Sequence, residues 1–453
     1  MNIAGHFLTR LSALIGACAL FAVVAGPAGA TNIERVVTPA GVEVWLVRDQ
    51  AVPLITIEFS FDGGSSQDPD DKPGVANFTA SMLDEGAGDL DSNAFAQRME
   101  RKAIEFSVRA GRDSVRGSMR TLSENRDEAF GLLKLALNAP RFDAQPLERV
   151  RAQIMSSLQR ETMNPGDIAS RRWWQTTFPD HPYGRPVSGT LESVPQISAD
   201  DLRTYTKRIL ARNNVKIGIV GDVDAETVKR LVDDVFGGLP AKANLRGVPN
   251  VEPKLLGRPV GAKINVPQAV VMFGGPGIAR DDPQFMAAYV ANHVLGGGSF
   301  SSRLYREVRE KRGLAYSVYS AMFWLQHAAL FIGTTATRAD RVEESVNIIE
   351  REIREMAEQG PTEDELAKAK SYLASSFALN LDTSAKIASQ LVQMQVDNLG
   401  IDYIDRRAGL IDAVTLEDAK KAAKRLFGNG LQFSIAGPTG DDFKAQDPAV
   451  RPN

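Results

Sequence analysis

A weak internal duplication constrains the fold of this chain more than any other feature of its sequence. Segments of similar pattern recur with an offset of roughly 215 residues. An alternating apolar run at Leu54 to Asp62 leads into a turn and a helical pattern, and the run at Ala269 to Pro276 does the same. Each half closes on a strand pattern, at Val215 to Gly221 and at Leu431 to Gly437. The sequence therefore predicts an α+β fold of two similar halves, each a mostly antiparallel sheet with helices on one face.

Helix starts and a structureless stretch support the same division of the chain. Three segments place a hydroxyl residue three positions before an acidic one, as in a capping box: Thr362 with Glu365, Thr415 with Asp418, and Ser198 with Asp201. Residues 239–263 are rich in proline, glycine and lysine and have no sustained periodicity. The predicted parts are a leader (1–30), an N-terminal domain (31–240), a linker (241–262), a C-terminal domain (263–440) and a loose tail (441–453).

Residues 1–30 have the three parts of a secretory leader. Arg10 gives a basic start, an apolar stretch follows, and Ala28-Gly29-Ala30 forms an A-x-A cleavage site before Thr31. The apolar stretch is too short to span a bilayer comfortably. The sequence thus predicts a periplasmic chain without a transmembrane span, and without cysteine, because Cys18 lies in the leader. A lipoprotein acylated at Cys18 is the alternative.

The segment from Gly296 to Ser320 combines a glycine-rich loop, an arginine-rich helical pattern and a strand pattern. Apolar residues four positions apart give the helix one common face, and its arginines, which alternate with glutamates as on a solvated face, fall largely elsewhere. Gly313 predicts the end of the helix. Arg309 leaves the last helical turn and Tyr316 begins the strand seven residues later. The corner between them is able to bring the guanidinium and the phenol close together.

The run from Ser301 to Ser317 resembles the signature of the C-terminal half of pitrilysin/insulinase-type zinc peptidases, the group with an inverted His-x-x-Glu-His motif. Loop, arginine helix, Arg-x6-Tyr spacing and Gly-Leu-x-Tyr occur together here. The resemblance implies that Arg309 and Tyr316 contact the substrate backbone and help to stabilise the transition state at a zinc bound elsewhere. It also implies a substrate channel beside the loop. The candidates for peptide contact in that loop are Gly296, Gly297, Gly298 and Ser299.

The zinc motif of that family is missing where the resemblance places it. The family's Gly-x-Ala-His-Phe-x-Glu-His-Met matches Gly74 to Met82, which reads GVANFTASM. Asn77 and Ser81 stand at the histidine positions, Ala80 stands at the glutamate position, and the third ligand falls at or beside Ser157. Asparagine and serine are poor zinc ligands, and no histidine outside the leader has the i,i+4 histidine partner of a helical zinc pair. We therefore expect this chain to bind no zinc.

Some members of this family are two-chain enzymes, in which one chain has the zinc motif and the other has the Arg/Tyr pair. The sequence resembles the second kind, which implies a clamshell assembly, a homologous partner that binds the zinc, and a peptide substrate. The rival hypothesis is a non-catalytic peptide-binding or scaffolding protein. A third reading, an independent zinc peptidase with other ligands, has few histidines from which to build a site. The formal net charge of -3 gives no overall attraction to nucleic acid.

Overall fold

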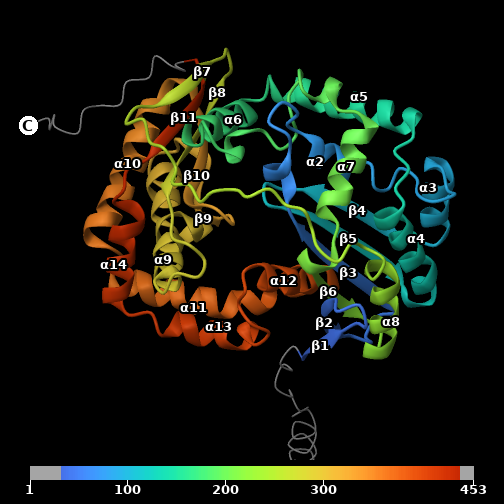
Figure 1. Ribbon diagram of the computed structural model, residues 1–453. Helices are drawn as coiled ribbons and strands as arrows, with labels where there is room; N and C mark the ends of the chain where they lie inside the picture. Colours follow the sequence, from blue (N-terminus) through green and yellow to red (C-terminus); the bar gives the residue numbers. More distant parts are fainter. Residues whose placement is uncertain (1–31, 439–453) are drawn as a thin grey trace, which may run out of the picture. The chain divides into compact units, whose positions relative to one another are not determined.

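The computed structural model describes residues 32–438 (Figure 1). The predicted leader with Cys18, the cleavage position at Thr31 and the predicted tail at 441–453 lie outside the described residues. Among the helices that are described, none has the length and the apolar character needed to cross a bilayer.

The first half is built on a sheet with the strand order β1-β2-β6-β3-β5-β4. Its strands are β1 (Ile33–Val37), β2 (Glu43–Arg48), β3 (Leu54–Asp62), β4 (Glu105–Ala110), β5 (Ser114–Leu122) and β6 (Val215–Gly221). Its helices are α2 (Val75–Ala80), α3 (Ser92–Arg101), α4 (Arg126–Asn138), α5 (Ala144–Glu161), α6 (Pro165–Thr177), α7 (Ala199–Ile209) and α8 (Ala225–Phe236).

The second half is built on a sheet with the strand order β7-β11-β8-β10-β9. Its strands are β7 (Val260–Lys263), β8 (Gln268–Pro276), β9 (Ala315–Trp324), β10 (Ala329–Arg338) and β11 (Gln432–Gly437). Its helices are α9 (Phe285–Asn292), α10 (Val342–Gln359), α11 (Glu363–Leu379), α12 (Ser384–Val396), α13 (Tyr403–Asp412) and α14 (Leu416–Phe427).

The two sheets repeat one topology. When β2, β6, β3, β5 and β4 are matched with β7, β11, β8, β10 and β9, the strand order is the same. The first pair of each series is parallel, and the other neighbours are antiparallel. The predicted α+β fold of two similar halves with mostly antiparallel sheets is therefore confirmed.

Each half has its own apolar core between its sheet and its own helices. In the first half Phe59 of β3 contacts Phe236 of α8, with ring centroids 5.9 Å apart. In the second half Phe331 of β10 contacts Phe427 of α14, with centroids 5.0 Å apart. The three predicted capping boxes are all present, so these helices begin where their hydroxyl side chains bind free backbone N–H groups.

Each half also receives one helix from the other half, which the sequence did not predict. Helix α6 packs against β8 and β11 of the second sheet, and α12 packs against β6 and β3 of the first. Glycines make room for both helices, because a Cβ atom on Gly274 would lie 2.9 Å from the ring of Trp173, and one on Gly218 would lie 2.7 Å from the carbonyl oxygen of Ala388. Gly218 pairs with Glu58 in the sheet, on the face opposite to the core residue Phe59.

Hydrogen bonds hold both exchanged helices in place. The Trp173 indole donates to the carbonyl oxygen of Gln432 over 3.0 Å, and the Gln395 side chain donates to the carbonyl oxygen of Ile217 over 2.9 Å. Both acceptors belong to the last strand of the opposite half. The two halves are therefore interlocked, and each sheet has its second face covered only when the other half is folded.

The segment predicted as a linker is bound to both halves. Residues 241–259 form neither helix nor strand, whereas residues 260–262 belong to β7. The Asn244 N–H donates to the carbonyl oxygen of Arg208 in the first half, and the Val251 N–H donates to that of His327 in the second. These bonds fix the path of the segment without regular secondary structure.

Candidate functional site

The glycine-rich loop lies against the edge strand of the second sheet. Helix α9 continues into a π-helical turn, His293–Gly297, that passes close to β9. A Cβ atom on Gly296 would lie 2.8 Å from the backbone nitrogen of Ser320 and closer still to its hydroxyl. Glycine at this position is therefore explained by close packing. Gly297 and Ser299 are exposed, and the role of the loop in peptide contact stays a prediction.

The arginine-rich segment forms the predicted helix and ends at the predicted glycine. It includes a π-helical turn, Tyr305–Glu310, and its apolar residues Leu304 and Val308 are fully buried. Gly313 adopts a left-handed conformation with a φ of +61°, which glycine accepts at little cost. The Leu314 N–H then donates to the carbonyl oxygen of Val308 over 2.9 Å. This corner directs β9 back along the helix.

The corner brings Arg309 and Tyr316 together. The guanidinium carbon of Arg309 lies 4.5 Å from the centroid of the Tyr316 ring and 5.0 Å from that of Tyr305. The rings of Phe300 and Tyr305 lie nearly perpendicular to each other, with centroids 5.1 Å apart. Tyr316 is 79% exposed, although large aromatic side chains are usually buried. Sequence reasoning missed Tyr305, although its i,i+4 spacing from Arg309 was the available signal.

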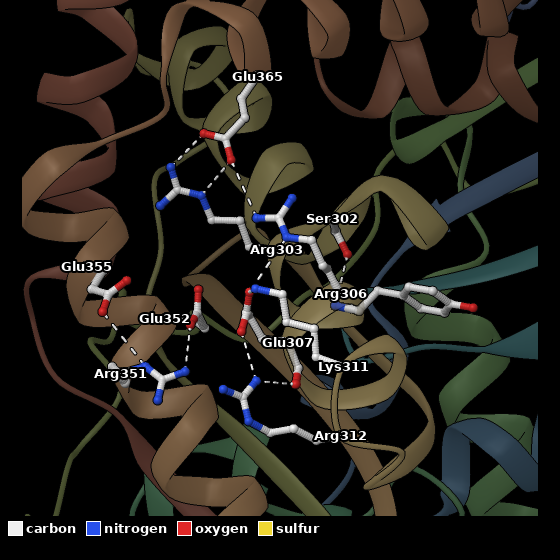
Figure 2. A network of polar contacts seen from close by, with 11 residues as sticks. Ser302, Arg303, Arg306, Glu307, Lys311, Arg312, Arg351, Glu352, Glu355 and Glu365 are labelled. Atoms are coloured by element: carbon white, nitrogen blue, oxygen red, sulfur yellow. Dashed lines mark hydrogen bonds and ion pairs between the residues drawn. The ribbon is translucent and has the colours of Figure 1, made fainter.

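Carboxylates bind the other basic residues of this segment, as Figure 2 shows. Arg303 makes a two-pronged ion pair with Glu365, over 2.9 Å from Nε and 2.6 Å from Nη2. Glu307 accepts hydrogen bonds from Lys311 over 2.7 Å and from Arg312 over 2.8 Å. Arg303 and Glu307 are buried, whereas Glu310, Lys311 and Arg312 are exposed. The predicted solvated face is therefore present at the end of the helix but does not include Glu307.

The pKa values of both acids are low. Burial raises the pKa of Glu307, but hydrogen bonds from Lys311 and Arg312 outweigh it and lower that pKa to about 2. Burial likewise raises the pKa of Glu365, and the bonds from Arg303 and from the capping-box N–H lower it to about 2. Both side chains are therefore charged near neutral pH. The pair of Glu365 with Arg303 holds the helix against α11, whereas Glu307 binds basic residues of its own helix end.

Arg309 is the exception among the arginines of this helix. Within residues 32–438 no carboxylate forms an ion pair or hydrogen bond with Arg309, whereas Arg306 lies 3.6 Å from Glu307. In the described part of the chain the Arg309 guanidinium lies instead against the faces of the Tyr305 and Tyr316 rings. The Tyr316 hydroxyl likewise has no hydrogen-bond partner in the described part of the chain. The donors of both side chains are available to an acceptor outside the chain.

The positions that resemble the zinc motif lie on two helices of the first half. Asn77 is on α2, and the hydroxyl of Ser81, one turn later, donates to its carbonyl oxygen over 2.9 Å. Ala80 is buried, and Ser157 lies half-buried on α5, which contacts α2. Residues 32–438 contain no group of three or more histidines, cysteines or acids that could hold a metal. The residues present do not fit zinc.

The three histidines of the described chain have structural contacts. The Nδ1 atom of His181 accepts the Tyr183 N–H over 3.2 Å, while its Nε2 lies 3.0 Å from a backbone carbonyl oxygen. His293 stacks on the ring of Tyr372. Burial lowers the pKa of both imidazoles. The backbone N–H of His327 donates to the Tyr183 hydroxyl over 3.1 Å.

Two family descriptions match this chain. "Insulinase (Peptidase family M16)" matches residues 43–191, and "Peptidase M16 inactive domain" matches residues 196–373. The division between the two matches falls before α7.

Relatives of known sequence and structure match most of the chain. A "non-peptidase homolog YmxG" of Helicobacter pylori is 29% identical over 375 residues, which are 80% of this chain and 84% of the relative. An "uncharacterized zinc protease" of Streptomyces coelicolor is 26% identical and covers 92% of both chains. The crystal structure of a "peptidase M16 inactive domain" from Pseudomonas fluorescens is 32% identical, covers 92% of this chain and 100% of its own, and has a TM-score of 0.84.

Proposed function

Because the chain belongs to the insulinase family of M16 peptidases, we propose that it is the subunit of a two-chain metallopeptidase that does not bind zinc. In this proposal Arg309 and Tyr316 bind the peptide backbone, and a homologous partner carries the metal at which hydrolysis takes place. The observation that carries the proposal is that Arg309 is not paired with an acid in the described part of the chain. Among the arginines of its helix it has no acidic partner in residues 32–438, and two tyrosine rings hold it.

The Arg309 and Tyr316 pair suits the recognition of a polarised carbonyl group. A guanidinium presents several N–H donors in one plane, so that Arg309 is able to hold a peptide carbonyl oxygen while its face stacks on the rings. The Tyr316 hydroxyl supplies one further donor from an exposed position. Donors that are fixed before the substrate arrives stabilise developing negative charge with little reorganisation. The buried Leu304 and the Gly313 corner provide that fixed position.

The first half supports a division of labour between two chains. Its motif positions hold Asn77, Ala80 and Ser81, and a hydrogen bond from Ser81 is already used within the helix. We therefore assign no metal chemistry to this chain and expect it to cleave no peptide alone. The predicted leader favours a periplasmic location for the complex. The name of the Helicobacter pylori relative, a non-peptidase homologue, agrees with an inactive isolated chain.

Reconstitution with the co-purifying partner tests the proposal. Removing one donor of this type typically lowers kcat by about 10²–10³, so Tyr316→Phe should slow the complex to that extent while assembly is kept. Arg309→Ala should weaken substrate binding as well as turnover. The matched controls are Tyr319→Phe, which changes another exposed tyrosine of β9, and Arg338→Ala, which removes an exposed arginine paired with Asp340.

The same experiment separates the enzyme from its rival. Normal turnover with both Tyr316→Phe and Arg309→Ala would reject the catalytic role and favour a peptide-binding or scaffolding protein. Loss of turnover in all four variants would indicate damage to the fold or to assembly. Size-exclusion chromatography of each complex distinguishes these outcomes.

A further inference from the structure

A cavity of about 330 Å³ opens in the first half, away from Arg309 and Tyr316, where α7 meets the segment that follows α8. Its lining includes the apolar side chains of Pro69 and Val75 and the cationic side chains of Arg208 and Arg246. Small-molecule sites typically have about 300–1,000 Å³ and combine apolar walls with a few polar groups. This cavity lies at the lower end of that range.

Within residues 32–438 neither arginine at this cavity forms an ion pair with a carboxylate. Arg208 donates only to neutral acceptors: Nε to the carbonyl oxygen of Asn244 over 3.3 Å, and Nη2 to the Gln67 side chain over 3.2 Å. The Arg246 backbone N–H donates to Gln67 over 2.7 Å, but its guanidinium forms no ion pair or hydrogen bond within residues 32–438. Burial lowers the pKa of Arg208, and the charge of Arg246 lowers it further, although the nearby charge of Asp68 raises it again in part. The two arginines therefore bring two positive charges to the cavity, and neither charge forms an ion pair within residues 32–438.

Asp201 also lines the cavity and Asp68 lies close to it, but other donors bind both carboxylates. Both oxygens of Asp201 accept the Lys72 ammonium, over 2.9 and 3.0 Å. The buried carboxylate of Asp68 accepts the backbone N–H groups of Gly74 over 2.7 Å and Ala76 over 2.8 Å. Burial raises the pKa of Asp68 to about 7, so its negative charge is only partial at neutral pH. The lining of the cavity therefore has two arginines and one acid, Asp201, whose charge is paired with Lys72.

We propose that this cavity binds a small organic anion whose carboxylate or phosphate oxygens are held by Arg208 and Arg246 and whose apolar part contacts Pro69 and Val75. Guanidinium groups bind both kinds of oxyanion in a two-pronged geometry. Thr204 also lines the cavity and offers its hydroxyl as a further donor.

A bound anion would add a further link between α7 and the segment that joins the halves, whose path backbone hydrogen bonds already fix. Arg246 belongs to this segment, whereas Arg208 belongs to α7, so that one ligand bridges the two. The inference is independent of the proposed peptidase role, because it uses neither Arg309 nor Tyr316.

Isothermal titration of the full chain at constant ionic strength tests the site with phenyl phosphate, benzoate and inorganic phosphate. We expect phenyl phosphate or benzoate to bind saturably at 1:1 and more tightly than inorganic phosphate. Whichever of phenyl phosphate and benzoate binds more tightly shows whether the site prefers a phosphate or a carboxylate. Arg246→Gln should weaken this binding at least about tenfold, since a charged hydrogen-bond donor to the anion is lost. The matched control, Arg203→Gln, lies on the same helix in an ion pair with Asp200 and should leave affinity unchanged.

Arg246→Gln is the decisive variant because its side chain supports no described contact, so its folding should be normal. Arg208→Gln removes bonds to Asn244 and Gln67 and needs a parallel circular dichroism spectrum. Absence of saturable binding for all three probes would overturn the proposal. Equal weakening by Arg246→Gln and Arg203→Gln would also overturn it, because it would indicate a diffuse charge effect. Preference for inorganic phosphate would refute the apolar contact.

Discussion

Replacement of Trp173 should destabilise both halves of the chain, although this residue belongs to the first half. Its side chain is fully buried in a cluster with Trp174 and Phe178 of its own half and Leu330 of the second. Its indole N–H donates to Gln432 in the last strand of the second sheet. The Trp173 side chain is therefore a direct physical link between the two folding units.

The expected loss follows from these contacts. Truncation of a buried tryptophan to alanine typically costs about 3–5 kcal/mol, because the apolar contacts are lost and a cavity remains. Trp173→Phe keeps most of the apolar ring but leaves the Gln432 carbonyl without its donor, which costs about 1–3 kcal/mol. The order of stability should thus be wild type, Trp173→Phe, Trp173→Ala. Phe95→Ala, in the core of the first half alone, is the control of similar size.

Urea unfolding followed by hydrogen exchange and mass spectrometry measures the effect in each half. Because α6 and α12 are exchanged, we expect peptides from β3 and from β8 to lose protection in one common transition. Trp173→Ala should shift both to lower urea concentration. A loss below about 1 kcal/mol, far from the range for buried tryptophans, would refute the reasoning. A shift of the β3 peptides alone would refute the link between the halves.

Three further predictions concern the acid network, the exchanged helices and the leader. Glu307→Gln should lower the free energy of unfolding by about 2–3 kcal/mol at pH 7, since a pKa lowered from 4.5 to about 2 corresponds to about 3.4 kcal/mol at most. A carboxylate whose pKa is lower in the folded state stabilises that state at pH values above the pKa of the unfolded state. In urea titrations at several pH values, the difference in unfolding free energy between wild type and variant should therefore be complete above about pH 4.5 and vanish as the pH falls through about 2. A difference that grows toward low pH would contradict this. Gly218→Ala should lower the free energy of unfolding by about 1–3 kcal/mol, because the added methyl group would overlap with α12. The control is Gly131→Ala, at a helix position with open space, which should raise the free energy of thermal unfolding by up to about 1 kcal/mol. N-terminal sequencing of exported protein should begin near Thr31, and a lipid on Cys18 would exclude that.

Features with a local pattern were predictable, and contacts between distant segments were not. The limits of β3 and β6, the capping boxes and the Gly313 corner follow from residue spacing, because alternation and capping act within a few residues. The ion pair of Arg303 with Glu365 joins residues 62 positions apart, and no local signal announces it. Helix α6 has the apolar pattern of any buried helix, so its sequence does not specify that its partner sheet lies in the other half. That Arg309 has no acidic partner within residues 32–438, whereas Arg303, Arg306 and Arg312 do, likewise depends on contacts that its sequence does not specify.

The helices that resemble the ligand-bearing helices of the family still contact each other, and the chain departs from the family at the ligand positions themselves. Asn77 and Ser81 lie one turn apart on α2, and Ser157 lies on α5 at or beside the third position. We therefore expect the triple variant Asn77→His, Ser81→His, Ser157→Glu to bind one zinc ion, since three protein ligands and a water complete a tetrahedral site. Ala80 stays unchanged, so the variant should have no general base and no activity.

Atomic absorption after dialysis measures the zinc bound to this variant. The double variant without Ser157→Glu is the control and should hold zinc more weakly, because two ligands do not complete a site. If the triple variant folds but binds no zinc, the spacing of α2 and α5 differs from that of a zinc-binding family member, as the ligand residues do. The loss of metal would then be built into the backbone of the first half, and substitution of side chains would not reverse it. If zinc binds, the loss lies in the side chains alone, and the fold keeps the geometry of a metal-binding ancestor.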